Sequence, residues 1–379
     1  MMYKKVFSIV FLVICCFVFV CVESNLLIND KSILVSENRE KEIEGVFPFA
    51  DGTKEIYGLS NRLLSPNEKI TGHSVTIRDK DGYLEKISVV GDISWHKEKI
   101  RELNDVCHDA GCEFAYISYP SKTNSKTIST EYGIDTNADA VRKDFLQFLH
   151  DEGIDCLDVR SLLESDGYGS KDIFYKTDHH WKTTAGFYAA RAIADFLNER
   201  YGYHLAVDAL DEEKFSFTTY NNLWFGETGR SLSRAWVNTL DDFTEIVPKY
   251  DTSISIYQSD GSEVSGDFKI MLDESGYKTK DVDYYSYSAH YSYSKNMHSP
   301  TTYHNNFATG DGKKILLIKD SFSIVVVPFI VLETADVTVW DMREDDTKNG
   351  LYEYINNNDF DVVLVAYTDY WSSFMWDFN

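Results

Sequence analysis

Amphipathic helices and short apolar strands alternate in two separate stretches of this chain. In the first stretch, apolar spacing predicts helices over residues 95–106, 138–150 and 185–201, and strands over 112–119 and 155–159. In the second stretch, strands are predicted over 315–318, 337–340 and 362–366, with a short helix near 351–355. Strands buried between helices are typical of parallel sheets. The sequence therefore predicts an α/β fold whose parallel sheet is flanked by helices.

The segment between these stretches breaks the alternation. From about residue 203 to 312 the chain is rich in Tyr, Ser, Asp and Asn, with short strands predicted at 215–219 and 253–257. We expect a Tyr/Ser-rich inserted lobe within a domain at 71–379. Residues 25–70 are polar and weakly patterned, which predicts a lead-in segment. The Lys80-Asp-Gly82 turn predicts a hairpin over residues 74–90.

The N-terminal segment indicates export. Lys4 and Lys5 precede an uncharged apolar run at residues 6–22, a pattern typical of signal peptides. Val22 and Ser24 suit cleavage before Asn25, yet the run also lies at the short end of membrane-spanning lengths. A cleaved signal peptide and an uncleaved membrane anchor over residues 1–24 both remain open. Either one predicts an extracytoplasmic protein, secreted or membrane-anchored.

The net charge and the cysteine content indicate which partners and which disulfide bonds to expect. The formal net charge of −24 argues against binding nucleic acid, whose phosphates need Lys and Arg. Three of the six cysteines lie in the N-terminal run, which leaves Cys107, Cys112 and Cys156. An odd number cannot pair fully within one chain. Buried thiols are expected, with a Cys107–Cys112 or Cys112–Cys156 bridge as the alternative.

Two short motifs carry groups suited to acid–base and nucleophilic chemistry. Asp178 and His180 are two residues apart, so in an extended or turning backbone the carboxylate can orient the imidazole. Ser321 follows the predicted strand 315–318, and ligands of open parallel sheets bind beyond the carboxyl ends of the strands. The joint pattern predicts a Ser-His-Asp hydrolase or acyltransferase, although Ser321 alone could simply cap a following helix.

Four further residues are candidates for binding substrate. Lys122 and Arg343 follow predicted strands, and Arg343 could grip a substrate carboxylate or pair with a neighbouring acidic residue. Arg230, in the segment GETGRSL, could meet an acidic sugar or be an ordinary loop arginine. Trp181 is expected to pack its helix onto the sheet, with stacking on a sugar as the alternative.

Metal binding is the competing chemistry. Asp178, His179 and His180 could share a metal ion, although His179 is expected to point away from the other two. The histidines that could join them are His290, His298 and His304. No pair has the HExxH arrangement or the cysteine spacing of zinc sites. We therefore predict neither a metal nor another cofactor.

The segment Asp178-His-His-Trp181, followed by Lys319-Asp-Ser-Phe322, resembles the bacterial DHHW proteins. These are similar to the alginate O-acetyltransferase branch of the SGNH hydrolase superfamily, in which the Asp-x-His-Trp motif precedes the serine, as it does here. The resemblance covers residues 90–200 and 310–370 and implies an SGNH-like fold with Ser321 as nucleophile, His180 as base and Asp178 as orienting group. It implies an exported O-acyltransferase, with acetyl as the expected group.

The acceptor implied by this resemblance is a cell-envelope or secreted polysaccharide, with a membrane-bound protein as the candidate acyl donor. Two alternatives remain at this point. One is a secreted carbohydrate esterase. The other is a non-catalytic glycan-binding or assembly protein on the same scaffold, because a fold does not determine a function.

Overall fold

The computed structural model describes most of the chain beyond the N-terminal segment. The described residues are 55–56, 58–60, 62–63, 68–71, 74–87, 89–122, 136–278, 288–308, 312–369 and 371–379. The expected signal or anchor at 1–24 lies outside them. The chain divides into two compact units, Met1–Pro66 with Leu232–Trp236, and Asn67–Ser231 with Val237–Asn379. Within the described residues, no helix has both the length and the apolar character needed to cross a membrane.

The larger unit is built on an eight-stranded sheet with the order β5-β4-β13-β11-β12-β10-β8-β9. The strands are β4 (Glu113–Tyr119), β5 (Asp155–Asp158), β8 (Ile254–Gln258), β9 (Glu263–Gly266), β10 (Thr301–Asn305), β11 (Lys314–Lys319), β12 (Asp336–Trp340) and β13 (Val362–Thr368). The strands from β5 to β12 in this order pair in parallel, and β10, β8 and β9 add antiparallel. The predicted α/β fold with a mostly parallel sheet is confirmed.

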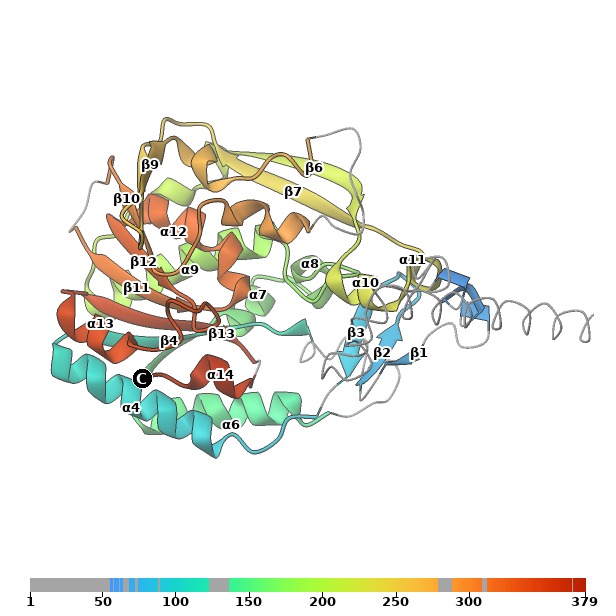
Figure 1. Cartoon of the computed structure of the whole chain (residues 1–379), viewed down its shortest axis with the longest axis horizontal. Helices are drawn as coiled ribbons and strands as arrows, with labels where there is room; N and C mark the ends of the chain where they lie inside the picture. The colour runs from blue at the N-terminus through green and yellow to red at the C-terminus, as the bar shows by residue number, and fades with distance from the viewer. Residues whose placement is uncertain are drawn as a thin grey trace, which may run out of the picture. The chain divides into compact units, whose positions relative to one another are not determined.

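Helices cover both faces of this sheet (Figure 1). One face carries α4 (Ser94–Ala110), α6 (Ala138–Asp151), α13 (Leu351–Asn357) and α14 (Ser373–Trp376). The other carries α7 (Val159–Ser165), α9 (Thr183–Tyr201) and α12 (Val327–Glu333). Leu316 and Ile318 of β11 lie in the first core, whereas Ile315 and Leu317 lie in the second. The uninterrupted apolar run of β11 thus supplies both cores, as expected for a strand buried on both sides.

The region 203–312 is only in part a separate lobe. Strands β8, β9 and β10 come from it, yet they extend the central sheet, with β10 paired to β12. Strands β6 (Phe215–Trp224) and β7 (Asp241–Pro248) form a separate two-stranded sheet. Alternating side chains predict that a strand exists, but they do not specify its partner.

A small antiparallel sheet precedes the main domain. It contains β1 (Glu68–Thr71), β2 (Ser74–Arg78) and β3 (Leu84–Ile87), and the β2–β3 pair is the hairpin predicted at 74–90. The Leu84 amide donates to the Lys176 carbonyl at 2.8 Å, which joins this sheet to the loop that carries Asp178.

The three cysteines in the described residues are free thiols. The Cys112 thiol lies 3.3 Å from the Cys107 carbonyl oxygen. The expectation of unbridged thiols therefore matches the structure.

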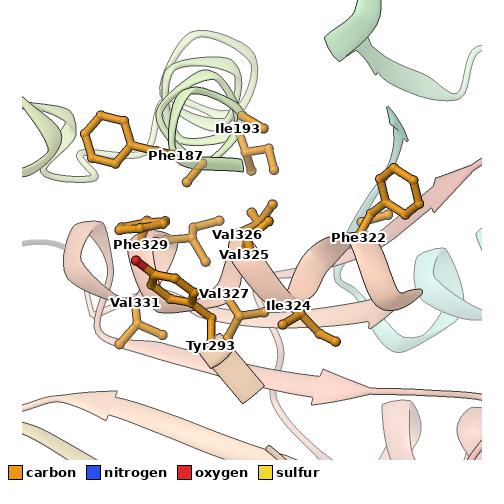
Figure 2. Packing of buried hydrophobic residues seen from close by; sticks show 14 of the residues in the cluster. Phe187, Ile193, Tyr293, Phe322, Ile324, Val325, Val326, Val327, Phe329 and Val331 are labelled. Carbon is orange, nitrogen blue, oxygen red and sulfur yellow. The ribbon is translucent and has the colours of Figure 1, made fainter. Parts of the chain in front are cut away.

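The segment after Ser321 forms a 3₁₀ turn, η7 (Ser321–Val325), and then α12, with Pro328 in its first turn. Figure 2 shows Phe187 and Ile193 of α9 facing Val325, Val326 and Phe329. A β-branched run has low helix propensity, so this burial stabilises the turn and the short helix. Gly186 lets the two elements approach, because a Cβ there would lie 2.4 Å from the Val325 carbonyl oxygen. The start of α9 is thereby held against the turn that carries Ser321.

Candidate active site

The three residues predicted as a triad lie in one line of hydrogen bonds. His180 Nε2 is 2.8 Å from Ser321 Oγ, and His180 Nδ1 is 2.6 Å from Asp178 Oδ1. All three side chains are buried. Because a carboxylate only accepts, Nδ1 carries the hydrogen and Nε2 is left to accept the hydroxyl proton of Ser321. The arrangement is therefore competent for proton transfer from serine to histidine.

The loop that carries Asp178 and His180 is a tight hairpin at the start of α9. Phe174 and Trp181 form an antiparallel bridge across it, and the Asp178 carboxylate also accepts from the His180 amide at 2.9 Å. Trp181 is fully buried and its indole N–H donates to the Phe322 carbonyl at 2.9 Å. Trp181 thus packs and joins the histidine loop to the serine turn, and its buried position leaves no face for a sugar to stack on.

Lys122 is a buried residue in the loop after β4, and it stabilises the same hairpin. Its ammonium group donates to the carbonyls of Tyr175, Lys176 and Asp178 at 2.6, 2.9 and 2.8 Å. Burial lowers the pKa of Lys122 to about 8, even though nearby carboxylates favour its charge. All three donor positions are therefore occupied by backbone, and Lys122 supports the loop and does not reach toward a ligand.

Replacing Lys122 by Met should lower the free energy of unfolding by about 3 kcal/mol, because buried carbonyls would lose charged donors. Denaturant unfolding monitored by tryptophan fluorescence measures this loss. Lys348→Met is the matched control, since Lys348 is exposed and pairs with Asp345 on the surface. Equal stability of the two variants would show that the Lys122 contacts contribute nothing.

Asp241, at the start of β7, organises the hairpin from another side. It accepts hydrogen bonds from the amides of Lys176 and Thr177 and from the Thr177 hydroxyl. The Thr177 hydroxyl in turn accepts from the Gly226 amide at 2.7 Å, and the Glu227 amide donates to Asp178 Oδ2 at 2.6 Å. The segment containing Gly226 therefore contacts the orienting carboxylate directly.

The charge state of Asp178 suits an orienting role. Burial alone would raise its pKa, but His180, His179 and the Glu227 amide together lower the pKa of Asp178 well below its ordinary value. The carboxyl group is thus ionised and can stabilise a positive charge that forms on His180.

Asp320 holds the turn that presents Ser321. Its Oδ1 accepts from the Phe322 amide at 2.9 Å, and its Oδ2 accepts from the amide and hydroxyl of Thr368 at 2.8 and 2.9 Å. The serine turn is therefore fastened to the end of β13. The Phe322 amide, which directly follows the serine, is already engaged by this contact.

The predicted substrate-binding arginines lie in different environments. Arg343 forms a two-point ion pair with Asp341, at 2.7 and 2.5 Å, and Asp341 also pairs with buried Lys319 at 2.8 Å. Its side chain is 34% exposed. Arg230 lies on α10 (Glu227–Leu232), the short helix whose first amide donates to Asp178.

His179 stays beside the triad, although the sequence suggested that it points away. Its Nδ1 is 3.6 Å from Asp178 Oδ1, while its side chain is 47% exposed. One ligand atom each from Asp178, His179 and His180 lies within 4.8 Å of the others. In this geometry Asp178 Oδ1 and His180 Nδ1 are already bonded to each other. A metal ion would have to break the contact that orients the base.

Removing divalent metal ions should leave any activity toward an activated ester unchanged, because Asp178 Oδ1 and both ring nitrogens of His180 are used by the hydrogen bonds of the triad. Activity before and after dialysis against a chelator tests this. Loss of activity that zinc restores would establish the metal alternative.

The contacts of His290 and Gly226 with the triad were not predicted from the sequence. His290, considered only as a metal ligand, stacks on the His180 ring and is fully buried. Gly226 lies so close to Asp178 that a Cβ there would be 2.4 Å from the Asp178 Cβ. The spacing of apolar residues around these two positions does not predict their contacts, because the contacts join segments that are far apart in the sequence.

Residues 90–267 match the family model of the SGNH hydrolase-like domain of acetyltransferase AlgX. The matched residues include Asp178 and His180 but end before Ser321. No curated protein matches the chain by sequence. The match confirms the resemblance drawn from the two motifs.

Solved structures of other bacterial proteins share the fold. PatB1 of Bacillus cereus, solved with a sulfonyl adduct, is 20% identical with a TM-score of 0.63, over 82% of this chain and 99% of that one. A DHHW family protein of Eubacterium siraeum is 18% identical with a TM-score of 0.58, over 80% of this chain and 93% of that one. At these identities the likeness establishes the fold.

Proposed function

Starting from the SGNH hydrolase-like acetyltransferase domain that residues 90–267 match, we propose that this protein is an exported serine O-acyltransferase that transfers acetyl groups to a polysaccharide. The observation that carries the proposal is the line of hydrogen bonds from Ser321 through His180 to Asp178. Lys4, Lys5 and the apolar run that follows support export.

The reaction runs in two halves. Ser321 Oγ attacks the carbonyl carbon of an acyl ester while His180 Nε2 takes its proton. The tetrahedral intermediate then expels the donor alcohol, which receives that proton, and an ester on Ser321 remains. In the second half His180 takes a proton from a sugar hydroxyl, whose oxygen attacks the ester and releases Ser321. Asp178 stabilises the charge on His180 in both halves.

The rim of the site suggests a polar acceptor. The Arg343 side chain, which Asp341 holds in place, is 34% exposed and lies near enough to Tyr291 for its charge to act on that phenol. Tyr291 is 41% exposed beside the His180 ring. A fixed guanidinium and an exposed phenol suit sugar hydroxyls and carboxylates. The acyl donor in this proposal is an ester presented by a membrane-bound partner protein.

The test is covalent labelling of the nucleophile. A fluorophosphonate should modify Ser321 in the purified protein, and peptide mapping should locate the adduct there, with Ser321→Ala as control. Acetyl transfer from an activated ester to oligosaccharides, measured against release of acetate, then separates transfer from simple hydrolysis. Acetate release without transfer would favour a carbohydrate esterase. Absence of any label on Ser321 would support the alternative that the protein binds glycans without catalysis.

A further inference from the structure

His290 lies flat against the proposed base. The rings of His290 and His180 are 3.9 Å apart between centroids, and their planes differ by 12°. His290 comes from the turn η6 (Ala289–Ser294), which is separated from both motifs in the sequence. Tyr291 stands edge-on to both rings, at 5.4 and 5.8 Å. One face of His180 is therefore covered by a parallel ring.

A second contact determines the tautomer of His290. Its Nε2 is 2.7 Å from the Ser321 carbonyl oxygen, and because a carbonyl only accepts, Nε2 carries the hydrogen. Its Nδ1 is buried and has no hydrogen-bond partner among the described residues. Burial, and then the charge of His180, lower the pKa of His290 well below its ordinary value. His290 is thus a neutral ring with one defined tautomer.

From these contacts we propose that His290 is a positioning residue for the acyl transfer, an inference that rests on the proposed function. Its N–H holds the carbonyl of the nucleophile, and its ring prevents His180 from rotating out of line between Asp178 and Ser321. Because the stacked ring is neutral, it adds no like charge beside His180 when His180 accepts the serine proton. One side chain therefore aligns the nucleophile and the base with each other.

Three variants separate the two contacts. His290→Gln keeps an amide donor within reach of the Ser321 carbonyl but lacks the ring, whereas His290→Phe keeps a ring and lacks the donor. His290→Ala lacks both. We expect His290→Ala to lower kcat and the rate of fluorophosphonate labelling by about 10²-fold with KM nearly unchanged, since small misplacement of reacting groups has this effect. The His290→Gln and His290→Phe variants should each lose less kcat and labelling rate than His290→Ala. His304→Gln, at a distant histidine on β10, is the control.

A structural readout makes the test independent of activity. The proton on His180 Nδ1 should give a downfield NMR signal, which should shift or broaden in His290→Ala. Labelling as fast as in the wild type, with an unchanged signal, would overturn the inference. If the wild-type protein itself does not label at Ser321, the proposed function fails. In that case only the NMR signal tests whether His290 positions His180. A signal that is unchanged in His290→Ala would then overturn the positioning role too. If His290→Ala does not fold, the same two measurements are made on His290→Gln and His290→Phe. Wild-type labelling rates and unchanged signals in both variants would overturn the inference.

Discussion

Replacing Ser321 by Ala should lower turnover of a small activated acetyl ester by ~10⁴–10⁶, and His180→Ala should have a similar effect, because each removes one member of a unit. The structure gives the reason, since the serine proton has one acceptor 2.8 Å away in His180 Nε2. Steady-state kinetics of the domain without residues 1–24 measures the loss.

The double variant should be little worse than either single variant, because the second residue has no role once the first is gone. Asp178→Asn should lower turnover by about as much or somewhat less, because Asp178 selects the tautomer of His180 and the amide does not. His179→Ala should have a smaller effect, because His179 lies beside the carboxylate at 3.6 Å and has no hydrogen bond to the serine. Multiplicative losses at Ser321 and His180 would show that they act independently. A severe loss at His179 with a mild one at His180 would mean that the other histidine is the base.

Gly226→Ala should lower turnover by about 10²-fold or more, because reacting groups displaced by about 1 Å lose that much. The added methyl group would lie 2.4 Å from Asp178 Cβ and 2.5 Å from its amide nitrogen, so one of the two loops must move. Overpacking of this kind also costs about 1–3 kcal/mol of stability. Kinetics and thermal unfolding of the same preparation separate the two effects.

The control for this variant is Gly91→Ala, because a Cβ built at Gly91 meets no atom within 4 Å among the described residues beyond its chain neighbours. If the loss arises through Asp178, then Gly226→Ala combined with Asp178→Asn should be little worse than Asp178→Asn alone. Additive losses, or a Gly226→Ala protein with normal turnover, would contradict this explanation.

The sequence was sufficient for those parts of the fold that have a local signal. Helical spacing predicted α4, α6 and α9, although α9 begins at Thr183, two residues earlier than expected. Apolar runs predicted β4 and β11, and the polar residues after them converge at one edge of the sheet. The triad could be proposed because its members sit in two recognisable motifs at strand and helix ends.

The remaining features depend on distant segments meeting. No local pattern shows that β10 pairs with β12, and so the region 203–312 was expected to stand apart. Arg343 follows a strand as predicted and pairs with Asp341, a neighbouring acidic residue, which was the alternative to binding substrate. Lys122 also follows a strand, yet only the structure shows that three carbonyls engage it. His290 lacks a local signal altogether, because its contacts are with residues on two other loops.

Strand β13 follows every other strand of the central sheet along the chain, yet it lies between β4 and β11. A nascent chain therefore leaves one edge of each of these strands unpaired until residues 362–368 have emerged from the ribosome. The same strand supplies Thr368, which holds Asp320 beside the nucleophile. Assembly of the catalytic centre therefore waits for this strand. A chain truncated before residue 362 should be inert toward esters, and its unpaired strand edges should make it prone to aggregate.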